Sequence, residues 1–184
     1  MKSQKGRGRY AMNAKELCYI GICSALLTVC SWICVPIGSV SVTLQTLALF
    51  VLSGVLGARR ALFAVLTWLA LGLFGVPVFA GFTGGFGKLF SPTGGFLLGF
   101  IVAAPITGGL YRGRLWQRTL ACVLGMAIYN AFAVVWFCAL YTGFFSGGLW
   151  ASITVCVLPY LPFDVIKIAL ALVLAEQLKR KIKT

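Results

Sequence analysis

Residues 118–140 read RTLACVLGMAIYNAFAVVWFCAL, an apolar stretch whose one charged side chain is the opening Arg118. About 20 apolar residues are enough for an α-helix to cross the hydrocarbon core of a membrane. Five further stretches share this character, some slightly shorter: 17–36, 42–58, 61–76, 95–111 and 162–178. The pattern predicts an all-α integral membrane protein with six transmembrane helices, forming a single domain over residues 1–184.

The composition agrees with a chain that is surrounded by lipid. Of the 184 residues, 60% are hydrophobic and 10% are charged, and the mean hydropathy is +0.99. A soluble domain has about 25% charged residues, because a surface in water needs polar cover. The composition therefore indicates a membrane protein and not a water-soluble domain.

Basic residues gather in short clusters between the apolar stretches. Fourteen of the 16 basic residues precede the first stretch, separate the second from the third or the fourth from the fifth, or follow the sixth. With six spans, all four clusters lie on one side of the membrane. The positive-inside rule then predicts that both termini are cytoplasmic. The net charge of +13 does not indicate nucleic-acid binding, since the bases alternate with apolar spans instead of lying on a polar surface.

No metal, cofactor or nucleotide site is predicted. The chain has no histidine, and its seven cysteines lie in or beside apolar stretches, where thiols act as small hydrophobes. The Gly87-Lys88 dipeptide is not part of a P-loop, because Phe82 and Leu89 stand where that motif needs glycine and serine or threonine. We therefore expect that the protein is not an enzyme and that energy for uphill transport comes from partner subunits.

Three ionisable side chains lie away from the basic clusters: Lys88, Asp164 and Lys167. Pro162 is expected to open the last helix, which places Asp164 in its first turn and Lys167 one turn deeper on the same face. Charged groups in or near a bilayer are costly unless they are paired or hydrated, so this pair is a candidate ligand site. A pair that only caps the helix is the alternative, and the two roles are compatible.

Two further features bear on the site and on partners. Residues 75–96 read GVPVFAGFTGGFGKLFSPTGGF, and such a loop of glycine and phenylalanine suits a lid or a pocket wall. In the first stretch, Gly21 and Ala25 are four residues apart, as are Ser24 and Thr28. Small residues at this spacing let helices approach closely in lipid, either within this chain or in contact with another subunit.

Several motifs together resemble the BioY family. They are IGSVSVTLQT at 37–46, GVPVFAG at 75–81, PTGGF at 92–96 with GFI at 99–101, and PFDVIK at 162–167. The motifs extend over most of the chain, and the spacing between the first three also matches. Two positions depart from the family pattern: Ser91 stands where glycine is usual, and Phe96 stands where tyrosine is usual, which removes a hydroxyl group.

This resemblance implies an S-component fold and the capture of biotin at the outer face of a bacterial or archaeal plasma (inner) membrane. It also implies assembly with the transmembrane coupling protein of an energy-coupling factor (ECF) transporter and with two ABC-type ATPases. Asp164 would accept the N–H groups of the ureido ring, and Lys167 would donate to its carbonyl or to an acidic tail. Further ligand contacts are expected from Val42, Gln45, Phe79, Gly81, Phe82 and Tyr160, and contacts with the coupling partner from Gly21 and Ala25.

Three other functions are alternatives to a biotin-binding S component. An S component for another small, vitamin-like substrate would share these features. A membrane-embedded enzyme is disfavoured, because an acid–base pair is hard to assemble without histidine and with one acid on the outer side. A scaffold whose small-residue faces only join helices would bind no ligand saturably.

Overall fold

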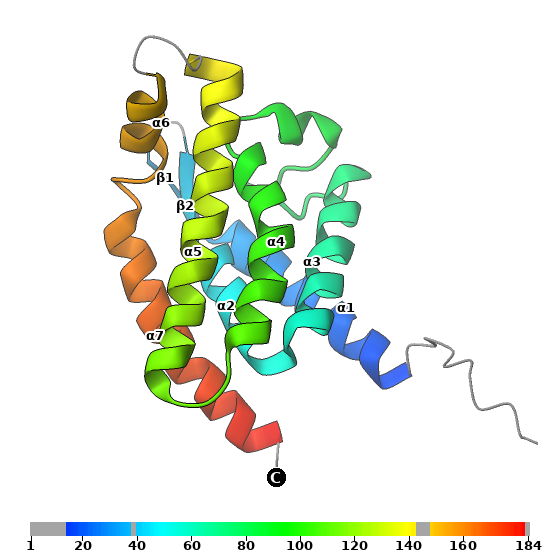
Figure 1. Ribbon diagram of the computed structural model, residues 1–184. Helices are drawn as coiled ribbons and strands as arrows, with labels where there is room; N and C mark the ends of the chain where they lie inside the picture. Colours follow the sequence, from blue (N-terminus) through cyan, green and yellow to red (C-terminus); the bar gives the residue numbers. More distant parts are fainter. Residues whose placement is uncertain (1–13, 38–39, 143–147, 183–184) are drawn as a thin grey trace, which may run out of the picture.

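The computed structural model describes residues 14–37, 40–142 and 148–182, which are mostly helical (Figure 1). Beside the helices there is one antiparallel β-hairpin, made of β1 (Cys34–Ile37) and β2 (Val40–Thr43). A short 3₁₀ helix, η1 (Phe86–Phe90), lies in the loop after α3, and a π-helical turn, η2 (Cys138–Thr142), extends α5. The helices are α1 (Ala14–Trp32), α2 (Gln45–Leu56), α3 (Ala58–Leu73), α4 (Gly94–Leu110), α5 (Leu115–Phe137), α6 (Gly148–Cys156) and α7 (Leu161–Ile182).

Each of the six predicted apolar stretches overlaps one of these helices, and α6 lies between the fifth stretch and the sixth. By length and apolar composition, two of the described helices can cross a membrane, Ala14–Trp32 and Leu115–Tyr141. Gly148–Cys156 and Leu161–Lys181, which meet at an angle of 49°, can form a third span together. These helices support a multi-pass membrane protein, whereas the number of six spans and the side on which the termini lie stay predictions.

The β-hairpin corrects the predicted helix boundaries. The stretches 17–36 and 42–58 were expected to be helical throughout, but residues 34–36 and 42–43 belong to paired strands, with Val35 opposite Val42. Valine, isoleucine and threonine favour extended backbone, and the residue before a proline, here Val35, is biased away from helix. Hydropathy alone does not separate such a strand from a helix end. The loop after α3 likewise begins earlier than expected, since residues 74–76 follow the helix as a turn around Gly75, whose φ is +96°.

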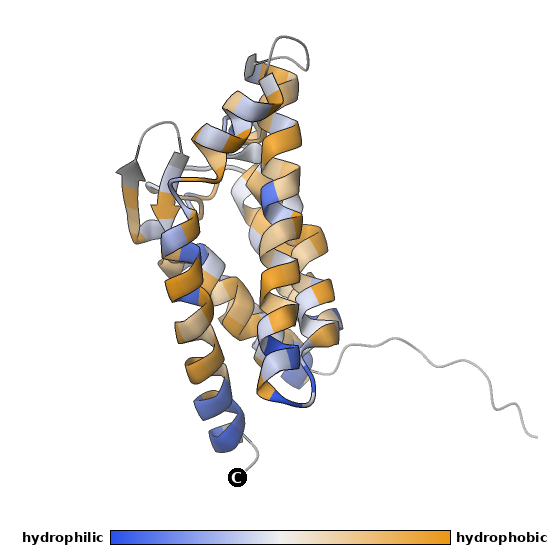
Figure 2. Ribbon diagram, turned by 60° about the vertical axis from the view of Figure 1, so that its left-hand side comes forward, coloured by the Kyte–Doolittle hydropathy of each residue, from blue (hydrophilic) through white to orange (hydrophobic). Residues whose placement is uncertain are grey.

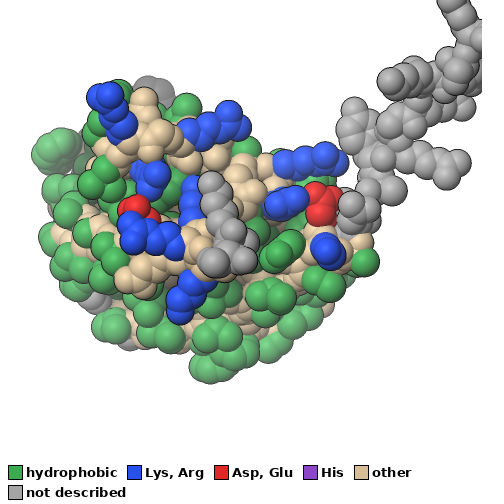
Figure 3. Space-filling model, turned by 90° about the horizontal axis from the view of Figure 1, so that it is seen from below, with side chains coloured by type: hydrophobic (Ala, Val, Ile, Leu, Met, Phe, Trp, Pro, Cys, Tyr) green, Lys and Arg blue, Asp and Glu red, His purple; other side chains and the backbone are tan. Residues whose placement is uncertain are grey.

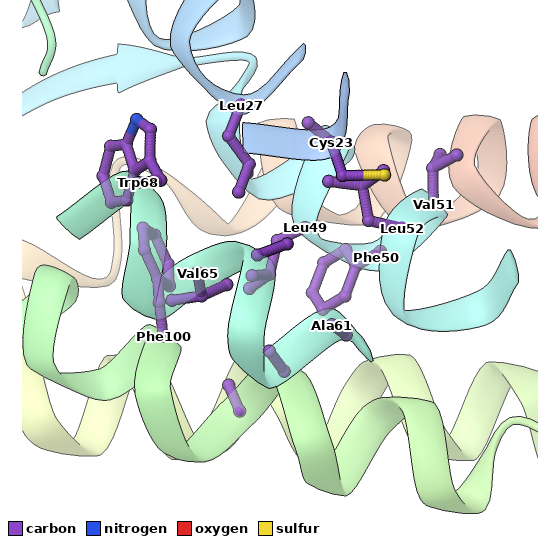
Figure 4. Close-up of a cluster of buried hydrophobic side chains, with 14 of the residues drawn as sticks. Cys23, Leu27, Leu49, Phe50, Val51, Leu52, Ala61, Val65, Trp68 and Phe100 are labelled. Atoms are coloured by element: carbon purple, nitrogen blue, oxygen red, sulfur yellow. The ribbon is translucent and has the colours of Figure 1, made fainter. Parts of the chain in front are cut away.

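The core is formed by α1, α2, α3 and α4 together with buried residues of α5 and α7, and Figure 4 shows part of it. Polar contacts tie these helices as well, since the Ser24 hydroxyl donates to the Ala64 carbonyl at 2.9 Å. In contrast, many large apolar side chains on the outer faces are exposed, and Figure 2 shows that hydrophobic residues make up most of the helices. An outward apolar surface of this extent is typical of helices that face lipid. The buried side chains labelled in Figure 4 include Leu27, Leu49, Phe50, Val65, Trp68 and Phe100.

Lysine and arginine side chains surround one end of the molecule, seen from below in Figure 3. Two ion pairs join helix ends there: Arg60 of α3 with Glu16 of α1 at 3.0 Å, and Arg118 of α5 with Glu176 of α7 at 3.6 Å. The first described residue of α1 and the last of α7 both belong to this end (Figure 1). The described members of clusters that are separate in the sequence therefore lie together at one basic end.

Candidate functional site

A cavity opens between the hairpin, the loop after α3 and helices α2, α4, α5 and α7. The first turns of α2, α4 and α7 contribute to it, whereas the basic end is formed by the starts of α3 and α5 and the end of α7. The cavity therefore lies in the half of the molecule away from the basic end. Its empty space, which includes the open mouth, is about 610 Å³.

The floor of the cavity is a buried polar cluster of Tyr129, Asp164 and Lys167. Asp164 is 4% exposed and Lys167 is 7% exposed. The Asp164 carboxylate accepts the Tyr129 hydroxyl at 2.7 Å through Oδ2 and the Lys167 ammonium at 3.2 Å through Oδ1. Ions that are withdrawn from water are tolerated when they are paired and hydrogen-bonded in this way.

The start of α7 explains how the acid and the amine meet. The helix begins at Leu161, so Pro162 occupies its first turn, where the missing N–H removes no helical hydrogen bond. The Asp164 N–H donates to the Tyr160 carbonyl at 2.9 Å, which ties Asp164 to the residue before the helix. Asp164 and Lys167 are then three residues apart on one helical face. The predicted arrangement of this pair is confirmed.

Close packing of α4 on α5 positions Tyr129. Gly99 faces the Tyr129 backbone, and a Cβ added at Gly99 would lie 2.7 Å from the Tyr129 Cα. Two phenylalanine rings of α4 flank the Tyr129 ring, Phe96 at 6.1 Å and Phe100 at 5.5 Å between centroids. These contacts fix the ring so that its hydroxyl reaches Asp164 in α7.

Two polar side-chain atoms at the start of α2 have no hydrogen-bond partner within the described part of the chain. Gln45 Nε2 and Thr46 Oγ1 are both buried without a hydrogen bond, and both residues line the cavity. A buried polar group that lacks a hydrogen bond costs about 1–3 kcal/mol. A bound ligand with polar atoms near α2 would remove this cost.

Aromatic and aliphatic side chains form the remaining walls. Phe79 is 1% exposed and packs edge-on against Trp68 of α3, with 5.0 Å between the ring centroids. Gly72 of α3 makes room for this ring, since any side chain there would collide with Phe79. Tyr160 and Val42, which also line the cavity, belong to a second apolar cluster. The site is therefore an apolar cavity with a small, buried polar floor.

Comparison with known proteins identifies the family. The family model described as "BioY family" matches residues 2–184. The chain belongs to the BioY family. A "Biotin transporter BioY" from Thermotoga maritima is 36% identical over 169 residues, covering 90% of this chain and 96% of that protein. A "Probable biotin transporter BioY" from Pyrococcus horikoshii is 34% identical, covering 91% and 98% of the two chains.

A solved structure shares the fold of this BioY-family chain. It is the crystal structure of the S-component for biotin from an ECF-type ABC transporter, with a TM-score of 0.79 and 22% sequence identity. The match covers 90% of this chain and 91% of the other. The fold described above is therefore that of an S component.

Most of the ligand contacts expected for a BioY protein meet in the cavity. Six of the eight predicted residues line it, from β2, the start of α2, the loop after α3 and the start of α7: Val42, Gln45, Phe79, Tyr160, Asp164 and Lys167. Their roles toward a ligand stay predictions.

Gly81 and Phe82 do not line the cavity, which corrects their predicted placement. A bridge between Phe79 and Thr83 closes a tight turn. Within this turn Gly81 and Phe82 have positive φ angles, +69° and +56°. The turn directs Phe82 outward, where it is 62% exposed and stacks on Trp32 at 4.8 Å between centroids. Ala80 takes the place on the cavity wall.

The two small-residue pairs of α1 have different surroundings. Ser24 faces the core and hydrogen-bonds to α3, so this row packs within the chain. Gly21 and Ala25 are on the exposed side of α1, and an added Cβ at Gly21 would meet no atom within 4 Å. Their contact with another subunit stays a prediction.

Sequence reasoning missed Tyr129, the hydroxyl donor of the floor. A signal was present, because Tyr129 and Asn130 are adjacent polar side chains in the middle of the apolar stretch 118–140. Polar groups at such depth in a span usually face the protein interior and serve a function. Phe96 lacks the hydroxyl group of the usual tyrosine, but two other tyrosines, Tyr129 and Tyr160, line the cavity.

Proposed function

We propose that this protein is the biotin-binding S component of an ECF-type vitamin uptake transporter. The observation that carries the proposal is the buried Tyr129–Asp164–Lys167 cluster at the floor of an otherwise apolar cavity. Membership of a family whose relatives are named biotin transporters supports biotin as the ligand.

The chemistry of biotin suits the two ends of this cluster. The ureido ring has two N–H donors and one carbonyl on a rigid ring. The Asp164 carboxylate has lone pairs beyond those that accept Tyr129 and Lys167, so it can accept a ureido N–H. The Lys167 ammonium has three hydrogens, and one of those not directed at Asp164 can donate to the ureido carbonyl. Gln45 Nε2, which has no hydrogen-bond partner among the described residues, is a second donor for that carbonyl.

The proposal includes a direction and partners. Biotin would enter from the outer face, with both termini in the cytoplasm of a bacterial or archaeal cell and six membrane spans. A transmembrane coupling protein and two ABC-type ATPases would supply the energy, consistent with the lack of a P-loop motif in this chain. The exposed Gly21–Ala25 side of α1 is the proposed contact with the coupling protein.

Isothermal calorimetry on the detergent-purified protein tests the ligand. We expect saturable, one-to-one binding of biotin and no binding of other water-soluble vitamins at the same concentration. Protein purified without added ligand should also release biotin on denaturation. Binding of a different vitamin in place of biotin would instead support the second candidate, an S component for another small substrate, while the absence of any saturable ligand would support a scaffold.

A Tyr129→Phe variant tests the hydroxyl on the floor. It removes the 2.7 Å hydrogen bond to Asp164 and keeps the ring. We expect the Kd for biotin to rise on the order of tenfold, since a hydrogen bond to a charged group contributes about 1.5–3 kcal/mol and orients the carboxylate. Tyr19→Phe, on the exposed side of α1, is the matched control and should bind like the wild type. Equal affinities for both variants would show that Tyr129 does not orient Asp164 for the ligand.

A further inference from the structure

Lys88 is a third charged side chain on the cavity wall, and the floor cluster does not use it. It belongs to η1, in the loop between α3 and α4, and is half-buried. Among the residues that the structure describes, no acidic side chain pairs with it. The polar floor comes from α5 and α7, whereas Lys88 approaches the same cavity from the loop after α3 (Figure 1).

The acidic residues of the whole chain explain why Lys88 lacks an internal partner. The sequence has three acidic side chains, and all three belong to the described residues. Glu16 pairs with Arg60 at the basic end, and Glu176 pairs there with Arg118 and Arg180. Asp164 pairs with Lys167. A negative charge opposite Lys88 must therefore come from outside the chain.

The backbone at Lys88 is held in place by several hydrogen bonds. The Lys88 carbonyl accepts both the N–H of Ser91 at 3.2 Å and its hydroxyl at 2.6 Å. The Lys88 N–H donates to the Gly85 carbonyl at 3.1 Å, and the Gly85 N–H donates to the Gly72 carbonyl of α3 at 2.7 Å. The Ser91 side chain that makes one of these bonds stands where the family usually has glycine. A cation on a braced turn loses less conformational freedom on binding an anion than one on a loose loop.

We propose that Lys88 binds the carboxylate of the ligand and makes the site selective for an anionic tail. The inference rests on the proposed function, because biotin has a neutral ureido ring at one end and a carboxylate at the other. The inference also gives the two lysines of the cavity separate roles, since the ammonium group of either one could pair with an acidic tail. Lys167 is buried on the floor and bonded to Asp164, so it serves the ureido ring, and Lys88 on the wall formed by the loop after α3 serves the tail.

Calorimetry with two ligands on two variants tests the assignment. Biotin and biotin methyl ester share both rings, and only biotin has the negative charge. For wild-type protein we expect biotin to bind about tenfold more tightly than the ester, because an ion pair in a partly buried site contributes about this much. Lys88→Gln should lower biotin affinity about tenfold and leave the affinity for the ester unchanged, so that the preference disappears. Lys88→Arg should restore it. Lys181→Gln, which removes the same charge at the basic end, should keep the full preference.

The outcomes separate the inference from the function on which it rests. If the wild-type protein binds biotin and Lys88→Gln binds both ligands with the wild-type affinities, the role of Lys88 is overturned and the proposed function stays intact. An equal loss of both ligands in Lys88→Gln would also overturn it, since a structural defect does not distinguish the tails. Wild-type protein that binds neither ligand would overturn the proposed function, and the role of Lys88 would fall with it.

Discussion

Replacing Asp164 by asparagine is expected to lower the affinity for biotin by about 30-fold or more. The amide has nearly the same shape, but it has only one acceptor oxygen and no charge. Tyr129 and Lys167 both donate to the carboxylate, so the buried ammonium would lose its counter-charge. Removing one partner of a buried, hydrogen-bonded charge pair costs about 2–5 kcal/mol, and about 1.4 kcal/mol corresponds to a tenfold change in affinity. Calorimetry with biotin measures the loss.

Glu176→Gln is the matched control for this variant. It makes the same chemical change at the basic end, where Glu176 pairs with Arg118 and Arg180 on the surface. Exposed ion pairs of this kind contribute about 0–1 kcal/mol, so biotin affinity should stay at the wild-type value. Unchanged biotin affinity in Asp164→Asn would rule out Asp164 as the acceptor of the ureido N–H groups.

Replacing Gly99 by alanine is expected to disturb both the fold and the site. The added methyl group would lie 2.7 Å from the Tyr129 Cα and 3.1 Å from the Phe132 Cβ, so α4 and α5 must move apart. Overpacking of this kind costs about 1–3 kcal/mol, which would lower the thermal unfolding midpoint by about 5 °C. Because the movement displaces Tyr129 from Asp164 and also shifts Phe96 and Phe100, which line the cavity, we expect the biotin affinity to fall by about 30-fold.

Gly109→Ala separates this steric effect from the general effect of alanine on a helix. Gly109 belongs to the same helix, but its added Cβ would meet the Ala58 Cβ at an ordinary 3.8 Å. This variant should therefore melt at or slightly above the wild-type temperature and bind biotin normally, since alanine favours helix over glycine. If Gly99→Ala behaved in the same way, close α4–α5 packing would not be what positions Tyr129.

The sequence predicted the helices and the acid–amine pair because both depend on local spacing. Long apolar runs indicate helices in lipid, and a separation of three residues places Asp164 and Lys167 on one face whatever the rest of the fold does. The hairpin was missed because Val35 and Val42 are as apolar as a helix end, so hydropathy does not distinguish the two.

The parts of the site that sequence reasoning missed depend on contacts between distant segments. Tyr129 donates to Asp164, 35 positions further along the chain. No local sequence pattern predicts that α5 and α7 contact each other at these residues. The misplacement of Phe82 has a similar cause, since positive φ at two successive positions turns its ring toward Trp32. A motif indicates which segment matters, whereas the backbone of the turn decides which of its side chains faces inward.

The shortness of α2 has a consequence for the depth at which a ligand is bound. With 12 residues, this helix is about 18 Å long, whereas the hydrocarbon core of a bilayer is about 30 Å thick. It starts at the cavity, with Gln45 and Thr46 in its first turn, and ends next to Arg59 and Arg60 at the basic end. The bound molecule would therefore rest well below the lipid headgroups, and the barrier left between it and the opposite side would be only about as thick as this one short helix.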